Sequence, residues 1–113
     1  MGKSERDAAF TLAQRIMAHL LLIEHSPATD QRFHWMDEVE EFRNQIERKF
    51  SPIIRRHLKR ELGNVFAHVR RRVQRKMSRH GEHQAAAVLP GGCPCTIEQV
   101  LGDWEPEPVA VRR

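Results

Sequence analysis

Residues 51–81 read SPIIRRHLKRELGNVFAHVRRRVQRKMSRHG, and this stretch decides the fold. Ser51 followed by Pro52 is typical of a helix start, because serine caps the first turn and proline fits its first position. Gly81 is a typical helix stop. Between them, apolar residues recur every three or four positions, at Ile54, Leu58, Leu62, Val65, Val69 and Val73. One helix cannot bury such a stripe alone, so the pattern predicts an all-α bundle.

Two further long helices are predicted from the same periodicity, at about 5–24 and 30–50. Ser4 with Asp7 resembles a capping box before the first helix. A short C-terminal helix is expected to open at a second capping box and to end at Gly102. That second box consists of Thr96 and Gln99. The predicted core lies on these stripes: Leu12, Ile16, Leu20, Trp35, Val39, Phe42, Ile46, Leu58, Leu62, Val65 and Val69.

The chain has 113 residues, a length that favours one domain. We expect a single helical domain over 1–102 and a flexible, extended tail over 103–113, which is acidic at first and contains two Glu-Pro pairs. The longest apolar run near the N-terminus covers 20–23, far short of the ~20 residues that span a bilayer, so no membrane association is expected. Cys93 and Cys95 flank one proline and would close a strained ring, which favours a reducing cytoplasm.

Positive charge is concentrated in one part of the chain. Residues 55–79 contain ten Lys or Arg and one acid, so they carry +9, whereas the whole chain carries +4. The remainder is therefore −5, with acids gathered in the second helix and near the C-terminus. One interpretation is a nucleic-acid contact face, since clustered cations release counterions from phosphate. Its candidate residues are Arg56, Lys59, Arg60, Arg70 and Arg71.

The alternative is a solvated helix that faces acidic partners in the same protein or in a neighbouring subunit. The second helix supplies such acids, and aromatic residues for base stacking are nearly missing from the basic segment. This structural or partner-facing interpretation is preferred.

The sharpest constellation for chemistry consists of His80, His83, Cys93 and Cys95, which offer four zinc ligands if the Gly-Gly turn brings the pairs together. The spacing is not a strong zinc pattern, and two unrelated surface features are the favoured interpretation. No cofactor is expected. The sequence contains no phosphate-binding glycine loop, nucleophile elbow or triad order, so we do not expect an enzyme.

Three motifs resemble a known family: GKSER at 2–6, AHLLL at 18–22 and CPCTIEQVLGDW at 93–104. In this order, with long helices between them, they resemble the bacterial family catalogued as domain of unknown function 29, over about residues 2–106. The resemblance implies an all-α cytoplasmic bundle and no established activity. It also implies that Cys95 stands where a tyrosine is usual, which weakens the zinc interpretation.

The same resemblance implies that this chain is an N-terminally shortened member, because relatives usually carry another helical stretch before GKSER. The first helix has a broad apolar surface, with Phe10 and Met17 beside the main stripe. Two partner helices would leave part of it uncovered, and such a patch favours association. The preferred function is therefore a protein-interaction or self-association module, with a protein partner or a homo-oligomer. Nucleic-acid binding and metal binding are the alternatives.

Overall fold

The structure is a computed structural model that describes residues 2–109, and it is all-α. Three long helices, α1 (Gly2–His25), α2 (Arg32–Lys49) and α3 (Pro52–Arg79), form the body. A 3-10 turn, η1 (Thr29–Gln31), leads into α2, and two short helices follow, α4 (His83–Ala87) and α5 (Ile97–Leu101). The described residues include no strand. The predicted fold class is thus confirmed, whereas α4 was not predicted.

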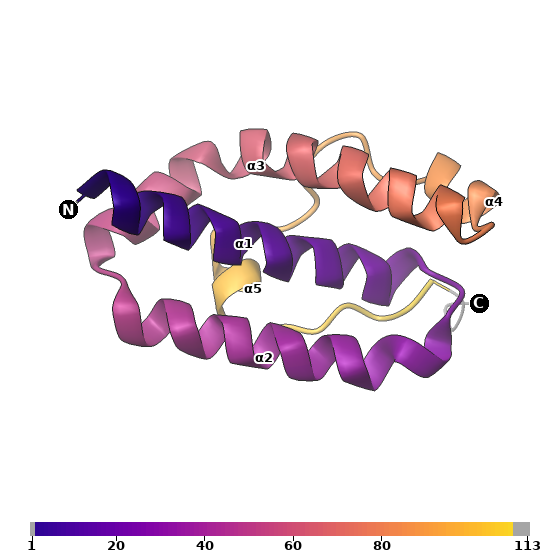
Figure 1. The fold of residues 1–113 in the computed structure, drawn as a ribbon, viewed down its shortest axis with the longest axis horizontal. Helices are drawn as coiled ribbons and strands as arrows, with labels where there is room; N and C mark the ends of the chain where they lie inside the picture. The colour runs from indigo at the N-terminus through magenta and orange to yellow at the C-terminus, as the bar shows by residue number, and fades with distance from the viewer. Residues whose placement is uncertain (1, 110–113) are drawn as a thin grey trace.

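Helix α1 is the centre of the bundle (Figure 1). It packs along both α2 and α3, whereas α2 and α3 touch each other little within the described chain. The remaining side is filled by α5, which packs against α1 and α3, and by the segment after it, which returns between α1 and α2. A central helix contacted from several sides must be apolar around most of its circumference. The run 20–23, with all four side chains buried, meets this demand.

The expectation of an uncovered apolar surface on α1 is wrong. Met17 is 2% exposed, and Phe10 is partly buried against the core. Pro94, Cys95 and Trp104, from the segments around α5, lie with Met17 around one small crevice. The strongly exposed large apolar side chains of the described residues lie outside α1, at Phe33, Ile53, Val88 and Val109. The C-terminal segments therefore cover what two helices would leave open.

The predicted core is confirmed at ten positions, and the exception, Phe42, is partly buried. Ser51 caps α3, since its Oγ accepts a hydrogen bond from the Ile54 amide at 3.4 Å. The helix runs unbroken through Gly63 and ends before Gly81, which adopts φ +78°. The predicted capping box of α5 is present as well. Helix α1 begins at Gly2, so Ser4 lies inside its first turn and the prediction that Ser4 precedes and caps the helix is wrong.

The described part of the predicted flexible tail, 103–109, is extended, and it packs on the bundle. Pro106 and Pro108 are buried, and the Val109 amide donates to the Glu24 carbonyl at 2.7 Å. Arg32 pairs with Glu105 at 2.6 Å. Within residues 2–109, no helix has both the length and the apolar character needed to cross a bilayer.

Candidate functional site

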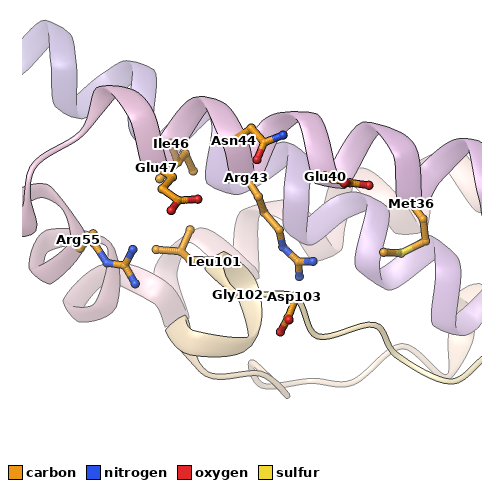
Figure 2. Close-up of a pocket in the computed structure, with 10 residues that line it drawn as sticks. All are labelled: Met36, Glu40, Arg43, Asn44, Ile46, Glu47, Arg55, Leu101, Gly102 and Asp103. Carbon is orange, nitrogen blue, oxygen red and sulfur yellow. The ribbon is translucent and has the colours of Figure 1, made fainter.

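Two half-open grooves lie on the surface of the bundle. The first, of about 610 Å³, lies between α2, α5 and the start of α3 (Figure 2). Its lining mixes both signs of charge, with Glu40, Glu47 and Asp103 beside Arg43 and Arg55. Figure 2 shows the Arg43 side chain reaching from α2 toward the end of α5.

Arg43 fastens α5 to α2. Its Nε donates to the Val100 carbonyl at 2.9 Å, and its Nη2 donates to the carbonyls of Gln99 at 2.8 Å and Trp104 at 2.9 Å. The guanidinium thus satisfies carbonyls at the C-terminal end of α5, where a positive charge is favourable. Burial lowers the pKa of Arg43, and nearby Asp103 opposes that shift. The Arg43 guanidinium already donates to three carbonyls, so its role in the first groove is to fix α5 against α2.

The second groove, which we call the basic groove, lies between α1 and α3 and has a volume of about 670 Å³. Arg15 of α1 is one of its lining residues. Four cations come from α3, and their spacing of three, four and seven residues places them on one helix face. These four are Arg72, Arg75, Lys76 and Arg79. The floor is apolar, with Leu22, Val69 and Val73, and the lining contains no acid.

The cations of α3 form no close ion pair within the described chain, although Arg55 shares the first groove with Glu40 and Glu47 of α2. The ion pairs of residues 5–109 involve His19, His25, Arg32 and His34, and none involves α3. The idea that acids of α2 satisfy this charge within the protein is therefore wrong. The physical reason is topological, because α1 lies between α2 and α3 except where the end of α2 meets the start of α3 (Figure 1).

His19 lies at the edge of the basic groove and connects it to α2. Its Nε2 is 2.5 Å from a carboxylate oxygen of Glu38, and its Nδ1 is 2.7 Å from the Arg15 carbonyl. The second oxygen of Glu38 is 3.1 Å from His34. Phe42 meets the His19 ring edge-on, and the Arg15 guanidinium lies 5.8 Å from the Phe42 ring centre. These contacts hold the α1 wall of the groove in place.

The five residues predicted to bind nucleic acid differ in their exposure to solvent. Arg56, Lys59, Arg60 and Arg71 are exposed. Arg70 is half-buried, and it donates to the carbonyls of Pro90 at 2.8 Å and Leu89 at 3.2 Å, so its guanidinium is engaged within the protein. None of the five lines the basic groove.

Sequence reasoning missed the five cations of the basic groove. The three- and four-residue spacing of Arg72, Arg75, Lys76 and Arg79 is a visible signal that they share a face. The pairing of that face with Arg15 is not visible in the sequence, because it depends on how α1 and α3 approach each other.

The four predicted zinc ligands do not converge. Across residues 5–109, no group of three or more His, Cys, Asp or Glu side chains is arranged to hold a metal ion. His80 and His83 are exposed where α3 meets α4, whereas Cys93 and Cys95 pack against the core. The two sulfurs are 3.7 Å apart as free thiols. Burial raises the pKa of the Cys95 thiol to about 12, and the neighbouring Cys93 and Glu24 add to that rise.

Comparison with known proteins assigns the chain to a family. No curated protein and no solved structure matches the chain significantly. A family model does match, and it covers nearly the whole chain, including the GKSER and CPCTIEQVLGDW motifs. The chain therefore belongs to the family described as Domain of unknown function DUF29, which matches residues 1–105.

Proposed function

We propose that this protein acts by binding, without catalysis, and that its contact surface is the basic groove. The partner carries clustered negative charge. The observation that carries the proposal is the set of five cations from two helices that line one groove with no acid among them. Cations held at such density repel one another, so an arriving anion relieves that repulsion and is attracted over a long range.

The covered surface of α1 also supports this choice. An open apolar face was the basis for expecting self-association, and that face is buried by α2, α3, α5 and the tail. Apart from separate exposed apolar side chains such as Phe33 and Ile53, the described surface of the bundle offers unpaired charge in the basic groove. An interaction module with this surface selects its partner by electrostatic complementarity, with binding that weakens as salt increases.

The experiment is salt elution from immobilised heparin, used as a generic polyanion. The groove variant replaces Arg72, Arg75 and Lys76 with glutamine, and the control variant replaces Arg56, Lys59 and Arg60 with glutamine. Both variants lose three charges from exposed positions of α3, and glutamine keeps the helix propensity nearly unchanged. We expect the groove variant to elute at clearly lower salt and the control to elute near the unmodified protein. Equal shifts would mean that net charge alone causes retention, which contradicts the proposal.

A second candidate is self-association through opposite charges. Helix α2 carries exposed acids without an ion pair to any described residue, at Asp37, Glu40, Glu41 and Glu47. This acidic face of one copy complements the basic groove of another. The contact joins two different surfaces, so it is heterologous and forms rings or open chains.

Sedimentation velocity at tens of micromolar tests this second candidate. If the candidate is right, the protein should sediment as an oligomer at 20 mM salt and as a monomer at 300 mM salt, because salt screens the attraction between the two surfaces. Glu40→Lys with Glu41→Lys should abolish that species, because the acidic face would then repel the groove. A monomer at both salt concentrations removes the candidate and leaves the groove proposal intact.

A further inference from the structure

The residue types that line the basic groove indicate which kind of anionic group its partner carries. Four of its five cations are arginines. A guanidinium presents a planar fork of N–H donors that matches two oxygens of a phosphate, and it stays charged at every physiological pH. The α3 row from Arg72 to Arg79 extends about 10 Å along the helix axis. Each strand of a nucleic-acid duplex carries one charge per about 3.4 Å of its axis, so this row faces about three phosphates of one strand.

The surroundings of the groove favour approach by a long polyanion. Further exposed cations lie on the outer side of α3, at Arg71, Arg60 and Arg56, and helix periodicity places them around the helix from the groove. The acidic helix α2 lies across α1 from α3 (Figure 1). A polyanion in the groove therefore meets the α3 cations on one side, and Glu38, which contacts His19, is an acid of α2 at the opposite edge.

An acidic peptide fits the groove less well. Protein interfaces gain most of their affinity from buried aromatic or apolar anchors, and exposed ion pairs contribute little each. The apolar floor residues Val69 and Val73 are already buried in the core. The large exposed apolar side chains, such as Phe33 and Ile53, do not line the groove. Phosphate binding needs no such anchor, because counterion release supplies the free energy.

A duplex also fits better than a single strand. Single-stranded nucleic acids are held by bases stacked on exposed aromatic rings. No Phe or Trp ring is among the described residues that line the groove, and Phe42, which contacts His19 and Arg15, is partly buried. No base-reading element enters the groove, so recognition is limited to the backbone.

We propose that the basic groove binds the phosphate backbone of a nucleic-acid duplex without reading its base sequence. This assignment rests on the proposed function and adds the class of the partner. Arg15 on α1 and the four cations of α3 contact phosphates from the two sides of the groove. The exposed cations beyond it contribute long-range attraction only.

The experiment is fluorescence anisotropy with labelled 20-base-pair duplexes of DNA and of RNA, each in two sequences, between 50 and 300 mM NaCl. Five phosphate contacts predict a slope of log K against log salt of about −4.5. The groove variant should reduce the magnitude of that slope by about 3, whereas the control variant should change it by less than 1. Two sequences of one duplex type should bind within about threefold of each other, and the tighter duplex type identifies the source of the phosphate.

Several outcomes would overturn this assignment. The assignment fails if no duplex binds at 50 mM NaCl. It also fails if the groove and control variants lose the same amount of duplex affinity. It fails as well if a single strand of the same length binds tenfold more tightly than the duplex. Poly-L-glutamate serves as the acidic-peptide probe. If it binds in a groove-dependent way and the duplex does not, the nucleic-acid assignment fails and the proposed function stands. If neither probe binds, both fail.

Discussion

At the scale of single residues, arginines of this chain that look equivalent in the sequence have different roles. Arg43 and Arg70 donate to backbone carbonyls of the C-terminal segments, whereas Arg72 and Arg75 line a groove and pair with no described residue. A guanidinium that holds several carbonyls contributes to folding, because its removal leaves part-buried acceptors without donors. An exposed one contributes mainly to the electrostatic field.

Arg43→Met should destabilise the domain by about 2 kcal/mol, because three carbonyls around the end of α5 lose their donor. Urea unfolding followed by tryptophan fluorescence measures the change, since Trp104 is one of the residues held. Arg48→Met on the same helix is the matched control and should change stability by less than about 0.5 kcal/mol. Equal effects of the two substitutions would show that the carbonyl contacts contribute nothing.

Cys95 should react slowly with iodoacetamide in the folded protein. Its pKa is raised to about 12, so little thiolate exists at pH 8. We expect alkylation at least ~100-fold slower than in the urea-unfolded chain. Because the raised pKa lies above the range tested, the rate should keep rising about tenfold per pH unit from pH 8 to 10. Peptide mapping by mass spectrometry separates Cys95 from Cys93, and a plateau near pH 9 would contradict the raised pKa.

At the scale of elements, the helices follow local rules. Capping side chains, proline at a first helical position and a terminal glycine explain the limits of α3 and α5. The sequence therefore predicts these limits well. It does not predict α4, whose five residues carry no side-chain cap. The contact between Gln74 and the Ala86 carbonyl at 3.3 Å fastens α4 to α3 instead.

Two glycines of the α3 region should respond to the same substitution with opposite signs. Gly81→Ala should destabilise the domain by about 1 kcal/mol, because φ of +78° disfavours any side chain. Gly63→Ala should stabilise it by about 0.5–1 kcal/mol, since the site is exposed, helical and free of contacts within 4 Å of an added methyl. Urea midpoints of the two variants give both values. Effects of the same sign would contradict the positions assigned to these glycines.

At the scale of the whole molecule, the last described segment completes the bundle. The sequence favoured a flexible tail after 102, because Glu-Pro pairs do not form helices. The same prolines suit an extended chain that packs between two helices, and Pro106 and Pro108 are buried there. Its anchors, from Arg32 and the Glu24 carbonyl, come from residues more than 70 positions earlier in the chain.

A chain that ends at Gly102 should therefore be less stable by about 2 kcal/mol or more, since Trp104 and the two prolines no longer cover α1 and α2. Thermal unfolding by circular dichroism measures this loss. The control is Pro27→Gly in the full chain, at an exposed proline, where we expect a much smaller change. An unchanged melting temperature on truncation would show that the segment is a free tail.

The sequence by itself determined the all-α class, the long helices, the core stripes and the family, because periodicity, caps and motifs are properties of neighbouring residues. Only the tertiary structure decided which charges remain unsatisfied. Arg43 meets a carbonyl 61 residues away and Arg70 one 20 residues away, so neither contact has a local signal. The basic groove exists because the packing of α1 against α3 brings Arg15 and the four cations of α3 around one hollow. Helix periodicity places a side chain on a face, but the packing of distant segments decides what that face meets.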